Sequence, residues 1–231
     1  MKKTWVIVAV IFLAFSGLFV WALKEKSDRT ADFNQFDTNS VIGANQYNGN
    51  IADHIKGNPK APVLIFEYAD YQCPGCSTTN PRINKLLKEY GDKLGLVYRH
   101  FLLSYHQNGT AAAASTEAAS LQGYWREYAD LLFRNQSTWE NSSPSDRTQI
   151  FASLFESASK GKGNIDKFKS DLSSERVKQK VEFDMGLAKK AKINATPTFI
   201  INGEKVDFSK AGTEEDFLNL MRQKINAALK K

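Results

Sequence analysis

The residues of this sequence that could carry chemistry are two cysteines separated by two positions, in the run Cys73-Pro74-Gly75-Cys76. They are the only cysteines among the 231 residues. At this spacing the two sulfurs can close a small disulfide ring and exchange it with other thiols. A Cys-x-x-Cys pair at a junction between a strand and a helix is typical of a redox-active dithiol. The spacing therefore predicts thiol–disulfide chemistry.

The elements around the pair predict different roles for the two sulfurs. A buried strand is expected just before them, from the apolar run Val63-Leu64-Ile65-Phe66. A helix is expected after them, from apolar residues three and four positions apart, namely Ile83, Leu86, Leu87 and Tyr90. Cys73 then lies at the helix N-terminus, where free N–H groups and the helix dipole stabilise a thiolate. Cys76 lies one turn inside and is the more covered, resolving thiol.

Three other interpretations of the cysteine pair compete with this one. Half of a zinc site is disfavoured, because zinc usually takes four ligands and the chain has no second Cys-x-x-Cys and only His54, His100 and His106. A purely structural disulfide is possible, but so short a ring constrains the unfolded chain little. The pair could also be inert buried thiols. We expect no metal and no cofactor.

The N-terminus carries a long uncharged stretch, residues 4–23, after Met1-Lys2-Lys3. As a helix it would be about 30 Å long, which matches the hydrocarbon core of a bilayer. We expect residues 1–23 to be an uncleaved membrane anchor that leaves the rest of the chain outside the cytoplasm. A cleaved signal peptide, giving a secreted or periplasmic protein, is the alternative. Residues 24–49 are polar without a clear period and are expected to form a tether.

Residues 50–231 are expected to form one α/β domain. A second apolar strand is expected near residues 94–103, and the period is helical over residues 110–190 except for a polar break at 135–145. Asn202-Gly203 predicts a hairpin turn, and Thr213 is expected to cap a final helix. The net charge of +6 is scattered along the chain and lacks the aromatic pattern of RNA-binding domains, so nucleic-acid binding is not expected.

This order of elements and four stretches of local sequence resemble the DsbA-like thiol:disulfide oxidoreductases of the thioredoxin-fold superfamily. The stretches are Gly57-Asn58-Pro59-Lys60-Ala61-Pro62-Val63, Phe66-Glu67-Tyr68-Ala69-Asp70-Tyr71-Gln72-Cys73-Pro74-Gly75-Cys76, Tyr98-Arg99-His100-Phe101 and Ala195-Thr196-Pro197-Thr198-Phe199. The resemblance covers roughly residues 50–230. With the expected anchor, the membrane-tethered members are the closest type. It implies a thioredoxin-like α/β fold with a helical insertion over about residues 108–191, preceded by a transmembrane helix.

The resemblance also implies roles for individual residues. Cys73 would form the mixed disulfide with the substrate, and Cys76 would resolve it. Pro197 would be the cis-proline that packs against the disulfide. Thr196 would offer main-chain groups to the substrate, and Pro74 and Gly75 would lie in the same binding region.

Glu67 is the remaining catalytic candidate. In thioredoxin-like proteins an acidic residue at this position lies behind the disulfide and handles the proton of the resolving thiol, and burial would raise its pKa. The alternative is an exposed glutamate on an alternating strand, and both remain open. We expect Asp70 to be a loop carboxylate and His100 and His106 to be structural. Gly75 stands where the best-known oxidases have a histidine, which would make the site less oxidising.

The sequence therefore predicts an extracytoplasmic thiol:disulfide oxidase that introduces disulfides into exported cysteine-containing proteins. The resemblance implies reoxidation by a quinone-linked membrane protein of the DsbB or vitamin-K-epoxide-reductase type, and we expect a monomer. A reductase or isomerase is the alternative with the same chemistry. A membrane-tethered binding or chaperone module with a structural disulfide, and a copper carrier, are alternatives from other classes.

Overall fold

The structure is a computed structural model that describes residues 31–230. The expected membrane anchor at residues 1–23 and the first part of the expected tether lie outside these residues. Over residues 31–230, every helix is too short or too polar to cross a bilayer. The compact unit that carries the cysteine pair begins at Phe33.

The centre of this unit is a five-stranded sheet in the order β1-β3-β2-β4-β5. Its strands are β1 (His54–Gly57), β2 (Val63–Ala69), β3 (Leu94–His100), β4 (Thr198–Ile201) and β5 (Glu204–Lys205). β2 and β3 run parallel, and the other neighbours are antiparallel. Most side chains of β2 and all of those of β3 are buried, as expected for central strands covered on both faces. The Asn202–Gly203 turn joins β4 to β5, and both residues have positive φ, as its sequence predicted.

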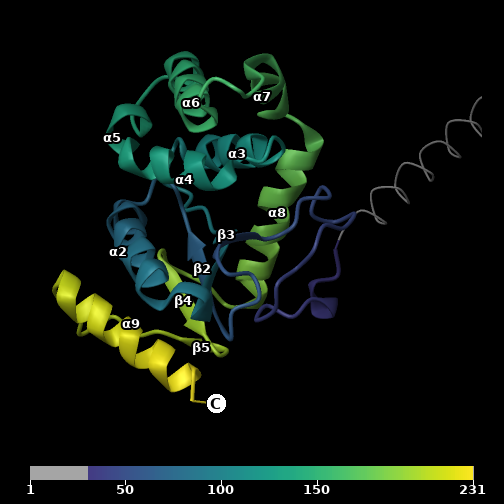
Figure 1. Cartoon of the computed structure of the whole chain (residues 1–231). Helices are drawn as coiled ribbons and strands as arrows, with labels where there is room; N and C mark the ends of the chain where they lie inside the picture. The colour runs from purple at the N-terminus through teal and green to yellow at the C-terminus, as the bar shows by residue number, and fades with distance from the viewer. Residues whose placement is uncertain (1–30, 231) are drawn as a thin grey trace, which may run out of the picture. The chain divides into compact units, whose positions relative to one another are not determined.

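Helices cover the two faces of the sheet. α2 (Pro74–Tyr90) and α9 (Glu214–Ala228) lie on one face, and α8 (Glu175–Lys190) lies on the other (Figure 1). The short helix η2 (Gly91–Lys93) connects α2 to β3. Apolar residues of the sheet, α2 and α9 form one core cluster, which includes Ile65, Ile83, Phe199, Phe217 and Ile225. Thr213 caps α9 with a reciprocal capping box, as predicted.

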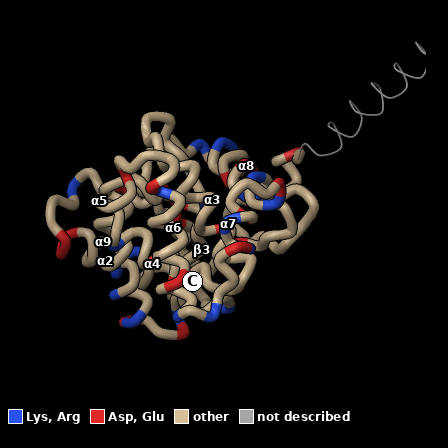
Figure 2. Tube along the Cα trace, turned by 90° about the horizontal axis from the view of Figure 1, so that it is seen from above, with Lys and Arg blue, Asp and Glu red and all other residues tan. Residues whose placement is uncertain are grey.

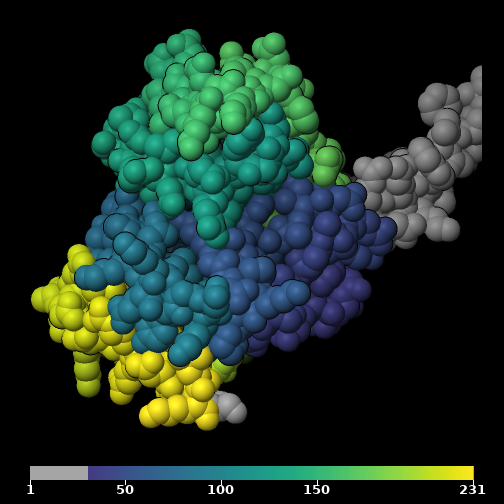
Figure 3. Space-filling model, viewed as in Figure 1, coloured from purple at the N-terminus to yellow at the C-terminus, as the bar shows by residue number. Residues whose placement is uncertain are grey.

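The helical block between β3 and β4 confirms the expected insertion. It comprises α3 (Gly109–Ser120), α4 (Trp125–Arg134), α5 (Gln136–Trp139), α6 (Pro144–Ser159) and α7 (Ile165–Asp171), and α8 returns the chain to the sheet. In Figure 3 this block, in teal and green, is stacked on the blue part that carries β2 and α2. Its core is aromatic, with Phe155 and Phe168 stacked at 4.4 Å between ring centroids.

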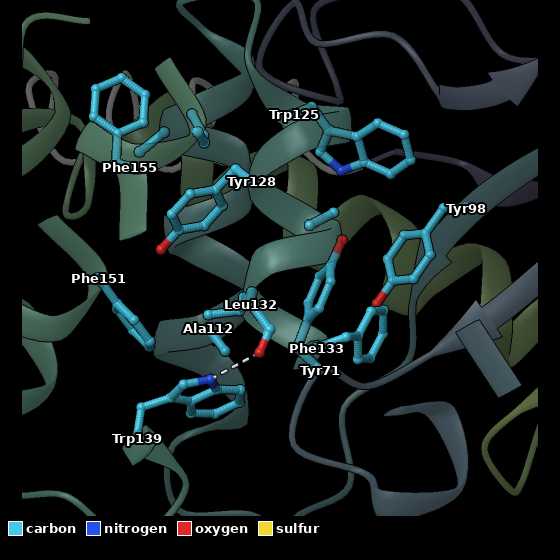
Figure 4. Packing of buried hydrophobic residues seen from close by; sticks show 14 of the residues in the cluster. Tyr71, Tyr98, Ala112, Trp125, Tyr128, Leu132, Phe133, Trp139, Phe151 and Phe155 are labelled. Atoms are coloured by element: carbon cyan, nitrogen blue, oxygen red, sulfur yellow. Dashed lines mark hydrogen bonds between the residues drawn. The ribbon is translucent and has the colours of Figure 1, made fainter. Parts of the chain in front are cut away.

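The expected polar break at residues 135–145 instead contains α5 and a buried tryptophan. The Trp139 side chain is fully buried, because its ring lies edge-on to Phe151 and its Nε1 donates to the Leu132 carbonyl at 3.0 Å (Figure 4). The single apolar residue of a polar stretch thus fixes the stretch to the core.

The expected tether over residues 24–49 is corrected for its described part. Residues 33–49 pack on the domain, and Phe33 and Phe36 lie 5.5 and 4.9 Å from the ring of Phe183 on α8. Gly186 leaves the space that the Phe33 ring occupies. Lys190 closes the contact by donating to the carbonyl of Phe33 at 2.9 Å. Phe33 and Phe36 give this polar segment an apolar contact with α8, which a free tether would lack.

A buried ion cluster fastens the same segment to β3 and α8. Arg99 contacts Asp53 at 2.7 Å and donates to the carbonyls of Thr38 and Ser40 at 2.7 Å each. Lys180 contacts the same aspartate at 3.2 Å. Burial raises the pKa of Asp53, but the two cations outweigh it and hold that pKa below its usual range. In Figure 2, the positions of Lys and Arg are interspersed with those of Asp and Glu along the chain.

Candidate active site

Cys73 lies in the connection between strand β2 and helix α2. β2 ends at Ala69, a short turn follows, and Cys73 is the N-cap of α2 with extended backbone angles (φ −74°, ψ 122°). Pro74 occupies the first turn of the helix, where its missing N–H is not needed. The Cys73 carbonyl accepts the first helical hydrogen bond, from Ser77 N–H at 3.1 Å. Its side chain therefore lies beside the free N–H groups of the first turn.

The two cysteines are free thiols with different exposure. The Cys73 residue is 7 % exposed, and Cys76 is fully buried. Pro74 and Gly75 between them are exposed. Cys73 thus lies at the edge of the protein surface beside an exposed turn, and Cys76 lies behind it, which is the asymmetry that the spacing predicted.

The two thiols also differ in acidity. Hydrogen bonding from the Cys76 thiol lowers the pKa of Cys73 to about 5, against the opposing effect of burial. Thr196 and the main-chain N–H groups of Gly75 and Cys76 act in the same direction. Burial raises the pKa of Cys76 well above its usual value, and its hydrogen bond to Cys73 adds to the rise. At neutral pH Cys73 is therefore the thiolate and Cys76 the thiol.

The loop before β4 lies against the cysteine pair. The Thr196–Pro197 peptide bond is cis, as the resemblance implied. The Cys73 sulfur lies 3.5 Å from the Thr196 carbonyl oxygen. A Cβ atom placed on Gly75 would lie 3.2 Å from Cδ of Pro197, so the proline ring packs on the exposed turn. The structure thus brings together all the residues predicted for the reactive sulfur and its surroundings.

Glu67 lies on the buried side of the pair. Its residue is 3 % exposed, which excludes the alternative of an exposed glutamate on the strand. Burial raises the pKa of Glu67 to about 7, and the positive charge of Lys56 opposes the rise. Its charge contributes to the raised pKa of Cys76. Its Oε1 accepts no hydrogen bond from the described residues. This is a carboxyl that can change protonation beside the resolving thiol.

Lys56 was not predicted as part of this region. It is buried on the edge strand β1, where its Nζ donates to Asn80 at 2.8 Å and to Asp130 at 2.6 Å. Asn80 belongs to α2 and Asp130 to α4. A groove of about 240 Å³ opens beside them, lined in part by Ser77 and Phe133. The only signal in the sequence is a lysine at an inward position of a short strand, which by itself indicates nothing.

The three histidines contact carboxyl groups, which agrees with the structural role expected for His100 and His106. Glu117 contacts His54 at 2.8 Å and His100 at 2.7 Å, and these two imidazoles hold its pKa below the usual range against burial. His106 contacts Asp70 at 2.8 Å. Asp70 lies in the turn after β2, as expected for a loop carboxylate, but it is fully buried. Among residues 31–230, the His, Cys, Asp and Glu side chains form no group of three or more that could hold a metal ion.

The chain matches a known protein family and several curated proteins over most of its described residues. A family model described as thioredoxin matches residues 49–222. Among curated proteins, the chain is 33 % identical over 156 residues to the Na(+)/H(+) antiporter NhaA 1 of Mycolicibacterium gilvum, a match that covers 66 % of this chain and 24 % of that protein. The chain spans about a quarter of the length of the curated relatives that it matches.

Solved structures share the fold over most of the described chain. Alpha-DsbA1 of Wolbachia pipientis is 26 % identical with a TM-score of 0.58, and the match covers 77 % of this chain and 92 % of that one. Oxidised BdbD of Bacillus subtilis has a TM-score of 0.65 at 24 % identity, over 83 % of this chain and 99 % of that one. A thioredoxin-like oxidoreductase of Silicibacter pomeroyi has a TM-score of 0.60 at 20 % identity, over 78 % and 93 %.

Proposed function

Because the chain belongs to the thioredoxin family and has the fold of its DsbA-like oxidoreductases, we propose that it is an extracytoplasmic disulfide oxidase acting through Cys73 and Cys76. The observation that supports this most is the environment of the Cys73 sulfur. Its pKa is lowered to about 5, it lies at the start of α2, and it is next to Thr196 and Pro197. Reactive cysteines are found in surroundings of this kind, whereas structural cysteines are inert and buried without them.

The proposed reaction starts from the oxidised pair. A substrate thiolate attacks the Cys73 sulfur, the bond between Cys73 and Cys76 breaks, and a mixed disulfide forms while Cys76 leaves as a thiolate. A second substrate thiolate then attacks the substrate sulfur of the mixed disulfide, and Cys73 leaves as a thiolate. Two substrate thiols have lost two electrons to the enzyme and become a disulfide. Because a thiol of low pKa is a good leaving group, the acidity of Cys73 favours this direction.

Glu67 is proposed as the proton donor and acceptor for Cys76. The leaving Cys76 thiolate is buried, so it needs a proton that water at the surface cannot deliver directly. A buried carboxyl with a pKa near 7 carries that proton in about half of the molecules at neutral pH. Lys56, Asn80 and Asp130 place charge and polar groups between this region and the groove beside α2.

The substrate would bind across the exposed turn and the proline loop. Pro74 and Gly75 are exposed next to Cys73, and the main chain of Thr196 lies alongside its sulfur. These contacts involve main-chain atoms and small side chains, which suits many different unfolded sequences. The substrates proposed are therefore exported proteins with reduced cysteines.

A reductase is the second candidate, and the identity of residue 75 favours it. Glycine supplies no positive charge to the Cys73 thiolate, so stabilisation depends on hydrogen bonds and the helix terminus. Equilibration of the pair with glutathione separates the two candidates. A reduction potential near that of DsbA, about −120 mV, supports the oxidase, and one near that of thioredoxin, about −270 mV, supports the reductase.

The proposed location and partners follow from the sequence. The uncharged stretch at residues 4–23 would hold the catalytic unit at the outer face of the membrane. A quinone-linked membrane protein of the DsbB or vitamin-K-epoxide-reductase type would reoxidise the pair. The match to the NhaA antiporters covers only about a quarter of those proteins, so ion transport is not part of the proposal.

Turnover of a reduced, unfolded protein substrate tests the function. The oxidised full-length protein should form disulfides in it, and Cys73→Ser should abolish this activity. Given a substrate that already carries a disulfide, the reduced Cys76→Ser variant should accumulate a mixed disulfide, visible on a non-reducing gel, because the Cys73 thiolate attacks the substrate disulfide and no Cys76 thiol remains to resolve the product. Absence of disulfide formation by the wild type, or full activity of Cys73→Ser, would refute the proposal.

A further inference from the structure

Asp70 lies three residues before Cys73, and its buried carboxylate binds three donors. Oδ1 accepts from the main-chain N–H of Gln72 at 2.8 Å. Oδ2 accepts from the main-chain N–H of Leu103 at 3.0 Å and from Nδ1 of His106 at 2.8 Å. The two main-chain N–H groups donate, and Nδ1 of His106 donates in the tautomer that carries its proton there, so the two carboxyl oxygens can accept all three hydrogen bonds.

The main chain of Asp70 contacts both cysteines. Its carbonyl accepts from Cys73 N–H at 3.0 Å. Its own N–H donates to the Cys76 sulfur and acts to lower the pKa of that thiol. The residue that binds the neighbouring loop with its side chain therefore also fixes the turn that carries the reactive pair.

The loop over residues 101–108 closes on this carboxylate. It begins where β3 ends, with Phe101 N–H donating to the Ala69 carbonyl at 3.0 Å. It ends at Gly109, where a Cβ atom would lie 2.9 Å from Oδ1 of Asp70. The main chain at Gly109 therefore lies directly against the carboxylate, where a side chain would collide with it.

The side chain of Gln72, two residues after Asp70, makes a separate set of contacts. Its Oε1 accepts from Asn108 N–H at 2.6 Å, and its Nε2 donates to the Glu140 carbonyl at 2.8 Å. These contacts fasten the helical insertion, which in Figure 1 lies above the end of the sheet where β2 leads into α2. Asp70 and Gln72 thus offer a matched comparison, because one holds the turn and the other holds the insertion.

We propose that Asp70 is a positioning residue of the thiol–disulfide site, which holds the turn before Cys73 so that the first N–H groups of α2 face its sulfur. The N–H groups concerned are those of Gly75 and Cys76, which contribute to the acidity of Cys73. If the turn loosens, these groups no longer point at the sulfur in every molecule, and the thiolate loses part of its stabilisation. The inference rests on the proposed function for what the thiolate does, and on the contacts above for how it is held.

The test compares four variants of the full-length protein with the wild type. The thiolate absorbance of the reduced protein is followed against pH, and the cysteine pair is equilibrated with glutathione. We expect Asp70→Ala to raise the pKa of Cys73 by about one unit, a tenfold loss in the ratio of thiolate to thiol below that pKa. Asp70→Asn keeps one acceptor oxygen, so its ratio of thiolate to thiol at Cys73 should fall only about threefold. In Gln72→Ala, and in the core variant Ile225→Ala far from the site, this ratio should stay within twofold of the wild-type value.

The outcomes separate this inference from the proposed function. A folded Asp70→Ala variant within twofold of the wild type would overturn the inference, as would an equally large shift in Gln72→Ala. Should Asp70→Ala fail to fold, Asp70→Asn decides in the same way, since a threefold loss supports the inference and a loss under twofold overturns it. A wild-type protein whose Cys73 titrates like a free cysteine would instead refute the proposed function.

Discussion

Replacing Glu67 by glutamine should stabilise the reduced protein at pH 8 and leave its stability nearly unchanged at pH 4. In the folded protein burial raises the pKa of Glu67 from 4.5 to about 7, although Lys56 opposes the rise. In the unfolded chain this carboxyl is solvated and titrates near its ordinary value. Between pH 4.5 and pH 7 the folded state therefore holds a proton that the unfolded state has released. The stability of the wild type should fall as the pH rises through this window.

The magnitude follows from the shift. A rise from 4.5 to about 7, at about 1.4 kcal/mol per unit, corresponds to about 3 kcal/mol of stability that the wild type has at pH 4 and has lost at pH 8. Glutamine has nearly the same shape and no charge to bury, so the Glu67→Gln variant avoids this loss. For a unit of this size, about 3 kcal/mol raises the melting temperature by about 6–12 °C.

Urea unfolding of the reduced protein at both pH values measures the effect. The difference in unfolding free energy between Glu67→Gln and the wild type should be close to zero at pH 4 and about 3 kcal/mol in favour of the variant at pH 8. Glu127→Gln, at an exposed carboxylate of α4, is the control and should follow the wild type at both values. A gain of equal size at both pH values, or no gain at pH 8, would refute the argument that ionised Glu67 is costly to bury.

Three further changes test other parts of the structure. Gly75→His should lower the pKa of Cys73 below about 5 and shift the glutathione equilibrium toward the reduced protein by about tenfold, or about 30 mV, because an imidazolium stabilises a nearby thiolate. Arg99→Leu should cost about 3–5 kcal/mol in urea unfolding, since it leaves a buried carboxylate without its closest cation. Gly186→Ala should displace the Phe33 ring and expose residues 33–49 to proteolysis, with little change in the unfolding of the core.

Each of these changes has a control. Gly75→Gln adds a side chain of similar length without a charge, so an equal shift in this variant would contradict the electrostatic reason. Arg222→Leu removes a partly exposed arginine that pairs with Glu89 near the surface, and it should cost less than about 1 kcal/mol. Gly212→Ala adds a Cβ into open space and should leave residues 33–49 protected. Equal protease sensitivity in Gly186→Ala and the wild type would contradict the packing of that segment.

The elements of the fold could be predicted because they follow from local sequence. An apolar run gives β2, spacings of three and four give α2, and Asn202-Gly203 gives the hairpin, since each depends on neighbours within one or two turns of chain. The position of Cys73 at a helix N-terminus follows in the same way. Its asymmetry with Cys76, one turn inside, needs no tertiary information.

The surroundings of the pair could be predicted only in part. The sequence left open whether Glu67 is exposed or buried, because the position of a residue in a strand does not show whether its face of the sheet is covered by other elements. The packing of α2 on the sheet decides it. The segment expected to be a polar break packs on the core through Trp139. The segment expected to be a tether packs on α8 through Phe33.

The sequence by itself determined that the chain has a single Cys-x-x-Cys pair, and it predicted both the thioredoxin-like fold and the position of Cys73 at the start of a helix. Tertiary structure alone decided which charged groups reach that pair. Lys56 and Asp130 are 74 positions apart in the sequence but form a hydrogen bond in the structure. Asp70 and His106 are 36 positions apart and are also hydrogen-bonded. The pKa of a buried group depends on burial and on charges brought close in space, and neither quantity is written in the local order of residues.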